Sequence, residues 1–302
     1  MRIFYVYKML KKLVFTSKIP FQEGKKLINE ISSYFKLEKP IYLSDESSSL
    51  LGVQINVKKL SKNQLLEMRA LCLKYKIDVN YLPLNDTTKK ILIADMDSTI
   101  IQGESINELA SYAGVGKEIS EITSKGMNGE IDFEEGLRLR VKMLKGKSSN
   151  LFKKVIINTK LNSGAETLIK TLNSKGVNCY LVSGGFKFLT SFISKKLCFR
   201  DHYANDFEIN NDILTGNIIE PILDRGSKKK ILEDLCLFHN CTNLNVIAVG
   251  DGANDLNMLN TAGLGVAYEG KEILINNIDV QLSFSDLSGI LFLQGYYSSE
   301  FL

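Results

Sequence analysis

Three short runs of apolar residues constrain the fold of this 302-residue chain more than any other feature. They span residues 91–94, 179–182 and 246–249, and polar residues interrupt none of them. A strand that is apolar on both sides suits a parallel sheet with helices on both faces. Helical patterns lie between the runs, for example at 165–175 and 228–238. The sequence therefore predicts an open, doubly wound α/β sheet.

A polar cluster follows each of these runs. Residues 95–99 read DMDST, residues 183–185 read SGG, and residues 250–255 read GDGAND. Ligands of doubly wound sheets bind at the carboxyl ends of the strands, and neighbouring parallel strands would bring the three clusters into one crevice. Carboxylates, a hydroxyl and glycine amides at one place predict a metal–phosphate site.

The D-x-D-S-T and G-D-G-x-N-D patterns together resemble those of the haloacid dehalogenase superfamily of phosphotransferases. The resemblance extends from about residue 89 to the C-terminus. It implies a fourth element, a lysine at a helix start, and Lys228 is the matching position. It also implies a phosphatase with Mg²⁺ as cofactor, because a cation must offset the repulsion between a phosphate ester and a carboxylate nucleophile.

The resemblance assigns roles to the residues of the three clusters. Asp95 is the expected nucleophile, and Asp97 is the expected proton donor and acceptor. The side chains of Asp95 and Asp251 and the backbone carbonyl of Asp97 would hold Mg²⁺ through oxygen, which this ion prefers. Lys228, the Ser183 hydroxyl and the Gly184 amide would bind the phosphoryl group, and Asn254 and Asp255 would orient these ligands.

Plainer interpretations of these residues stay open. Asp95 and Asp97 could be solvated loop acids or a helix cap. Lys228 precedes two more lysines and could belong to a solvated helix start. Asn254 and Asp255 could cap the next helix. A fold of this kind can also lack activity.

A long insert separates the first two clusters. It carries helical patterns at 105–112, 117–124 and 133–144, and its stretch 124–132 contains two glycines and suggests a mobile loop. A connection of about eighty residues is far longer than an ordinary βα loop. We expect a helical cap at about 103–160 that excludes water and selects the substrate.

The insert narrows the resemblance to the phosphoserine phosphatase family. Residues 126–129 (GMNG) and 133–141 (FEEGLRLRV), with the glutamate at 104, are similar to the cap of that family. The likeness implies that Glu104 meets the substrate ammonium, that Arg140 binds its carboxylate, and that Met127 and Phe133 form an apolar wall. The alternatives are an exposed charged helix face for Arg138 and Arg140, a helix-terminus role for Glu104, and core positions for Met127 and Phe133.

The first segment has a different character. Strand patterns at 12–17, 41–44, 51–57 and 77–82 alternate with helical patterns at 21–35 and 62–75, which gives a ferredoxin-like βαββαβ order. The polar stretch 85–90 separates it from the rest, so we expect domains at 1–88 and 89–302. Some members of the resembled family carry an ACT-like domain here, and such domains often bind amino acids or form homodimers.

Bulk composition excludes several classes of protein. No apolar run approaches the roughly 20 residues of a membrane span, and the N-terminus lacks the pattern of a secretory signal. The number of cysteines, five, is odd, which favours a reducing compartment such as the cytoplasm. Basic residues outnumber acidic ones in the first ninety positions, but they are scattered, which favours a solvated face over a nucleic-acid site.

The leading hypothesis is hydrolysis of O-phospho-L-serine to L-serine and phosphate through an aspartyl phosphate, the last step of serine synthesis. One alternative is a phosphatase or phosphotransferase for another small metabolite, such as phosphohomoserine. Another is a non-catalytic amino-acid sensor.

Overall fold

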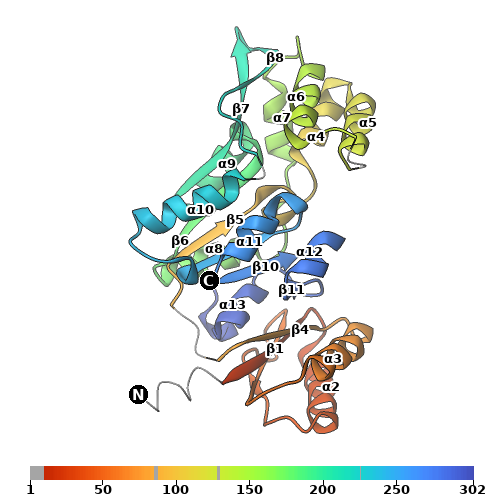
Figure 1. Cartoon of the computed structure of the whole chain (residues 1–302), viewed down its shortest axis with the longest axis vertical. Coiled ribbons are helices and arrows are strands. Elements are labelled where there is room, and N and C mark those ends of the chain that lie inside the picture. Colours follow the sequence, from red (N-terminus) through yellow and green to blue (C-terminus); the bar gives the residue numbers. More distant parts are fainter. Residues whose placement is uncertain (1–9, 85–87, 128–129, 225) are drawn as a thin grey trace.

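The computed structural model describes residues 10–84, 88–127, 130–224 and 226–302. Within these ranges the chain builds two sheets and a group of cap helices. The four-stranded sheet lies at the lower end in Figure 1, the seven-stranded sheet lies in the middle, and the cap lies at the upper end. Every helix of the described residues is too short or too polar to cross a bilayer.

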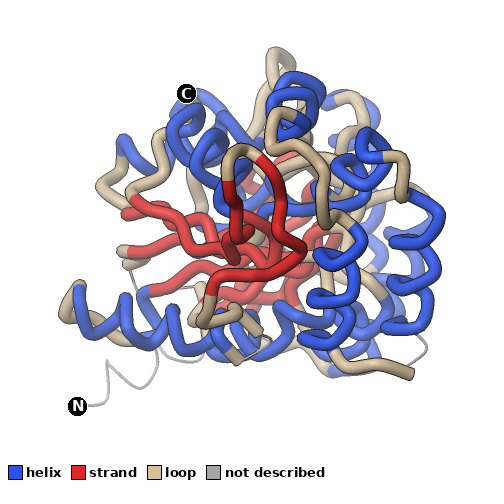
Figure 2. The backbone as a smooth tube through the Cα atoms, turned by 90° about the horizontal axis from the view of Figure 1, so that it is seen from above, coloured by secondary structure: helices blue, strands red, loops and turns tan. Residues whose placement is uncertain are grey.

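The larger sheet confirms the predicted doubly wound architecture. Its order is β11-β10-β9-β5-β6-β7-β8, and all neighbours are parallel except β7 and β8. Its strands are β5 (Ile91–Ala94), β6 (Asn178–Phe186), β7 (Asp201–Asn210), β8 (Ile213–Ile219), β9 (Val246–Gly250), β10 (Leu264–Tyr268) and β11 (Val280–Leu282). Figure 2 shows the strands in the centre with helices around them.

The apolar runs are uninterrupted because both faces of this sheet are buried. In β5, Leu92 and Ala94 pack on one face, and Ile91 and Ile93 pack on the other. The first face is covered by α8 (Ala165–Ser174), α9 (Lys187–Leu197) and α13 (Gly289–Gln294). The second is covered by α10 (Ser227–Phe238), α11 (Leu256–Thr261) and α12 (Glu272–Asn277).

The predicted insert is helical. It contains α4 (Ser105–Ala113), α5 (Gly116–Met127), α6 (Phe133–Met143) and α7 (Leu151–Asn158). The loop prediction for 124–132 is wrong at its start, because α5 continues to Met127. Residues 128 and 129 lie outside the described ranges.

The hairpin of β7 and β8 was not predicted. It rises beside the cap in Figure 1, and β8 lies against α6. An isolated antiparallel β-bridge between Ser148 and Ile213 connects the hairpin to the segment just before α7. The cap therefore rests on the hairpin as well as on the core.

The N-terminal sheet confirms the predicted βαββαβ order. Its elements are β1 (Lys11–Ser17), α2 (Phe21–Tyr34), β2 (Ile41–Tyr42), β3 (Leu51–Val57), α3 (Lys62–Lys74) and β4 (Asp78–Pro83). The strands are antiparallel in the order β2-β3-β1-β4. The strand predicted at 41–44 ends at Tyr42.

Both faces of this small sheet are also covered. Leu13 and Phe15 of β1 pack under α2 and α3, whereas Val14 joins the core that contains α13. The sheet approaches α13 closely at Gly52, where a Cβ atom would lie 2.5 Å from the Phe292 ring. This face of the N-terminal sheet is thus packed against α13, one of the helices that cover the larger sheet.

Candidate active site

The topology brings the three polar clusters together. The central strand β5 lies between β6 and β9, and all three strands run in the same direction. Asp95 follows β5, Ser183 lies near the end of β6, and Asp251 follows β9. The predicted meeting of the clusters at one sheet edge is therefore confirmed.

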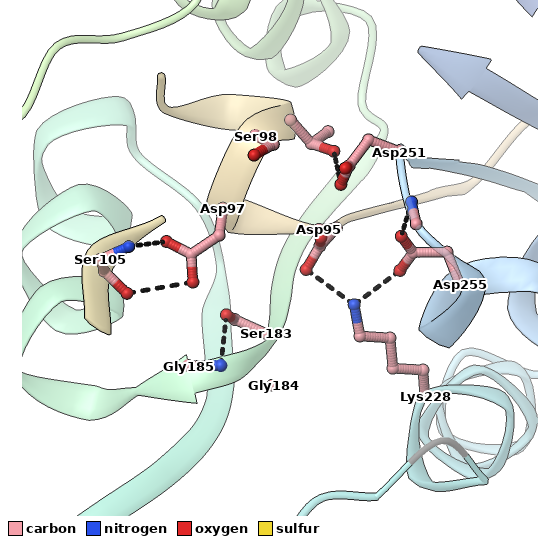
Figure 3. Close-up of polar contacts among 12 residues, drawn as sticks. Asp95, Asp97, Ser98, Ser105, Ser183, Gly184, Gly185, Lys228, Asp251 and Asp255 are labelled. Carbon is pink, nitrogen blue, oxygen red and sulfur yellow. Dashed lines mark hydrogen bonds and ion pairs between the residues drawn. The ribbon is translucent and has the colours of Figure 1, made fainter. Parts of the chain in front are cut away.

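Lys228 forms ion pairs with two aspartates of the site, Asp95 and Asp255. Its Nζ lies 2.7 Å from Asp95 Oδ1 and 2.6 Å from Asp255 Oδ1. All three side chains are buried, and Figure 3 shows Lys228 reaching between the two carboxylates from α10. The other oxygen of Asp255 accepts the N–H of Gly252 at 3.1 Å. The Lys228 side chain is therefore held inside the site and does not belong to a solvated helix face.

Three buried carboxylates form a group that fits a metal ion. One oxygen from each of Asp95, Asp251 and Asp255 lies within 4.8 Å of the others. Hard oxygen ligands of this kind suit a divalent cation such as Mg²⁺. Both oxygens of Asp255 are bound, one by Lys228 and the other by the Gly252 N–H. Asp95 and Asp251 line the cavity described below. This geometry supports a metal site at the expected place.

The electrostatics of the site also favour an added cation. Burial, and then the charge of Asp255, raise the pKa of Asp95 well above its usual range, although Lys228 opposes this. Burial likewise raises the pKa of Asp251, against the effect of Lys271. Burial and the charge of Glu104 raise the pKa of Asp97 to about 7. The carboxylates carry more negative charge than their lysine partners offset, which a divalent ion would correct.

Asp97 is held by the first residue of α4. Ser105 donates its backbone N–H to Oδ1 at 2.9 Å and its hydroxyl to Oδ2 at 3.0 Å (Figure 3). A Cβ atom on Gly185 would lie only 2.8 Å from Asp97 Oδ2. Glycine is thus needed at position 185 for this carboxylate to keep its place.

The loop at the end of β6 is fixed by a buried amide. Asn205 of β7 donates to the carbonyl of Gly184 at 2.9 Å and accepts the N–H of Leu223 at 2.7 Å. The Ser183 Oγ accepts the N–H of Gly185 at 2.8 Å. The hydroxyl hydrogen of Ser183 therefore remains able to point at a ligand.

A cavity of about 440 Å³ opens between the core and the cap. Its wall from the core includes Asp95, Asp97, Ser183, Gly184, Asp251 and Asn254. Its wall from the cap and the cap entry includes Glu104, Thr123, Phe133, Gly136 and Arg140. The Phe133 ring lies close over Gly184, since a Cβ atom there would be 3.3 Å from its Cζ. Most of the predicted site residues thus surround one space.

The two arginines of α6 have different environments. Arg138 is exposed and forms ion pairs with Glu134 and Glu220. Arg140 lines the cavity, donates to the carbonyl of Gly136 at 3.1 Å, and has a pKa lowered by burial. The interpretation as an exposed charged face therefore fits Arg138 and not Arg140.

Glu104 and Met127 complete the placement of the predicted residues. Glu104 is the N-cap residue of α4, but its carboxylate accepts the Ser98 hydroxyl at 3.1 Å and faces the cavity. The side chain of Met127 lies outside the described part of the structure. Its predicted role therefore stays a prediction.

Several functional contacts were missed from the sequence. Lys271 follows β10, lines the cavity and places Nζ 3.0 Å from Asp251 Oδ2. Ser105 and Asn205 hold site groups as described above. A lysine after a strand of the same sheet was a usable signal for Lys271, because that strand ends at the same edge. Neither Ser105 nor Asn205 belongs to a sequence motif that would indicate a place in the site.

Comparisons with known proteins identify the family of this chain. The sequence model of the haloacid dehalogenase-like hydrolases matches residues 89–263. A phosphoserine phosphatase of Archaeoglobus fulgidus is 40% identical over 202 residues, which cover 67% of this chain and 59% of the relative. The matched regions span between 52% and 59% of the lengths of three such curated relatives.

Two solved structures resemble nearly the whole chain, including the N-terminal sheet. A HAD family hydrolase from Salmonella enterica serovar Typhi has a TM-score of 0.86 at 28% identity, covering 94% of this chain and 98% of the other. A probable phosphoserine phosphatase from Vibrio cholerae has a TM-score of 0.77 at 29% identity, covering 96% and 88%. This chain belongs to the haloacid dehalogenase-like hydrolases.

Proposed function

We propose that this protein is a Mg²⁺-dependent phosphatase that hydrolyses O-phospho-L-serine to L-serine and phosphate. The observation that carries the proposal is the cavity in which Glu104 and Arg140 face the same space as Asp95. The curated and solved relatives named above include phosphoserine phosphatases, which supports the choice of substrate.

The cavity offers a complementary group for each end of an amino acid. The Arg140 guanidinium can bind a carboxylate through two parallel hydrogen bonds. The Glu104 carboxylate can pair with the α-ammonium. With these two ends held, the ester phosphate would extend toward Asp95. A substrate with only a phosphate would offer no carboxylate to Arg140 and no ammonium to Glu104, which disfavours its binding.

The assigned metal ligands are the side chains of Asp95 and Asp251 and the backbone carbonyl of Asp97. When bound, Mg²⁺ would supply positive charge that offsets the repulsion between the phosphate and the carboxylates. Asp255 is assigned a supporting role, because its two oxygens already bind Lys228 and the Gly252 N–H.

Besides the metal ion, the proposed reaction needs only groups of the chain and one water. The Asp95 oxygen attacks phosphorus while the ester oxygen leaves with the proton of Asp97, giving an aspartyl phosphate and L-serine. Asp97 next takes a proton from water, whose oxygen attacks the same phosphorus and releases Asp95 and phosphate. Lys228, the Ser183 hydroxyl and the Gly184 N–H stabilise the charge on the transferring group.

We also propose a division of the chain into domains and a cytoplasmic location. We place the N-terminal ACT-like domain at 1–88, the phosphatase domain at 89–302 and the cap at about 103–160. The end of β4 at Pro83 and the family match from residue 89 support the division. All five cysteines lie in described parts of the chain and are free thiols, which fits a cytoplasmic location.

A matched pair of arginine variants tests the substrate assignment. Arg140→Ala should lower kcat/KM for phosphoserine by about 100-fold, because a buried charge-assisted contact is lost. Arg138→Ala, on the same helix but exposed, should change it by less than about threefold. The measurement is phosphate release from a panel of phosphorylated metabolites, with Mg²⁺ and with chelator.

Two controls separate substrate choice from catalysis. Asp95→Asn should abolish release from every substrate in the panel. Arg140→Ala should leave the slower hydrolysis of esters without an amino-acid part unchanged. Equal turnover of sugar phosphates and phosphoserine by the unmodified protein would contradict the proposed specificity.

A further inference from the structure

Asp251 is one of the assigned metal ligands, and each of its two carboxylate oxygens and its backbone carbonyl contacts another group of the chain. Its Oδ1 accepts the Thr99 hydroxyl at 3.4 Å. Its Oδ2 lies 3.0 Å from the Nζ of Lys271. Its backbone carbonyl accepts the N–H of the same Lys271 at 2.9 Å. Lys271 therefore contacts Asp251 through both its backbone and its side chain.

The two lysines of the site are held very differently. Lys228 is 3% exposed and lies between two carboxylates that are themselves buried. The side chain of Lys271 is 55% exposed, although its partner Asp251 is only 7% exposed. Lys271 extends from the loop between β10 and α12 into the cavity mouth. Its ammonium can therefore leave the site for water at low cost, whereas that of Lys228 cannot.

A lysine ammonium and a divalent cation compete for the same negative charge. Both would draw on the carboxylate of Asp251, and their mutual repulsion is strong at short range in a partly buried site. Without any cation at Asp251, a buried carboxylate would stand beside Asp95 and Asp255 with less charge compensation, which is unfavourable. The ion pair of Lys271 with Asp251 reduces that cost when no metal is bound.

We propose that Lys271 is an exchangeable counter-cation of the metal centre, which neutralises Asp251 in the metal-free protein and releases it when a divalent ion binds. The inference rests on the proposed metal site. In this role Lys271 weakens metal binding and stabilises the folded metal-free protein. It is a positioning residue, since it acts through Asp251.

Metal titration of the full-length chain tests this role without measuring activity. The chelator-treated protein is titrated with MgCl₂ and with MnCl₂ in a calorimeter, in the absence of substrate. Lys271→Met should bind both ions about tenfold more tightly than the unmodified protein, because the competing charge is gone. Lys271→Gln provides a second neutral variant, and Lys271→Arg, which keeps the charge, should stay within about threefold of the unmodified protein.

The control is a lysine of equal exposure in another ion pair. Lys170 is 55% exposed and pairs with the exposed Glu166 on α8, away from the site. Lys170→Met should not change metal affinity. Thermal unfolding adds a second readout: the metal-free Lys271→Met protein should unfold at a lower temperature than the unmodified protein, and saturating Mg²⁺ should close the gap.

The outcomes are distinct. Unchanged or weaker metal binding by both neutral variants would overturn the role of Lys271 and leave the proposed phosphatase intact. A titration in which the unmodified protein binds neither ion would overturn the metal site and this inference together.

Discussion

At the scale of single residues, the site depends on side chains that hold other side chains. Asp97 can act as proton donor only if its carboxyl keeps a fixed direction toward the leaving oxygen. Ser105 binds both of its oxygens, and the close approach of Gly185 blocks other positions. The orientation of the proposed acid is thus set by the start of the cap.

Removing the Ser105 hydroxyl should lower kcat. Ser105→Ala deletes the bond to Asp97 Oδ2 but keeps the backbone bond to Oδ1. A hydrogen bond to a charged group contributes about 1.5–3 kcal/mol, so we expect kcat to fall by at least about tenfold. Steady-state kinetics with phosphoserine measure the effect.

The matched control is Ser111→Ala, at an exposed position of the same helix. It should leave kcat unchanged. If Ser105→Ala also left kcat unchanged, the proposed orienting role of Ser105 would be wrong.

At the scale of elements, three buried strands of the large sheet were predicted, and β7, β8, β10 and β11 were missed. Strands β5, β6 and β9 are covered on both faces, so their residues are apolar throughout and easily recognised. Strands β7 and β8 form the outer hairpin, and much of their length is exposed. Their mixed sequences, DHYANDFEIN and ILTGNII, carry no such signal.

The same physical difference divides the site residues. Asp95 and Asp251 follow recognisable strands and belong to patterns, so the sequence alone predicted their meeting. Lys271 follows β10, a strand that was not predicted, and Asn205 acts through contacts that depend on which strands become neighbours. That choice is made by tertiary packing, and local sequence does not record it.

At the scale of the whole molecule, a buried aspartate joins the two sheets. Asp78, at the start of β4, accepts the N–H groups of Ser283, Phe284 and Ser285 at 2.8, 2.9 and 3.0 Å. Two residues later, Asn80 exchanges two hydrogen bonds with the backbone of Gln281. Side chains of the N-terminal sheet thus satisfy the backbone at the edge of the larger one.

Loss of the Asp78 carboxylate should weaken this junction. Asp78→Ala leaves three N–H groups without their acceptor, at a cost of about 1–3 kcal/mol for each that stays dry. We expect the free energy of unfolding in urea to fall by at least about 2 kcal/mol. Asp45→Ala is the control, because Asp45 accepts similar bonds from Ser47 in an exposed loop.

The junction should also respond to pH. Burial raises the pKa of Asp78 from 3.8 to about 6, although three backbone N–H groups oppose this shift. The folded protein then binds this proton more tightly than the unfolded chain does. The contribution of Asp78 to the free energy of unfolding is therefore greatest below pH 3.8, and it is lost as the pH rises through about 6. Asp78→Asn should remove this dependence, and an identical pH profile for both proteins would contradict the assignment.

The central claim is that the carboxylate of Asp95 carries the phosphoryl group during turnover, and chemical trapping tests it most directly. The protein is mixed with phosphoserine and Mg²⁺, denatured and treated with borohydride, which reduces an aspartyl phosphate to homoserine. Peptide mass mapping should find homoserine at position 95. Phosphate release with no modification, or with modification at Asp97 instead, would contradict the account.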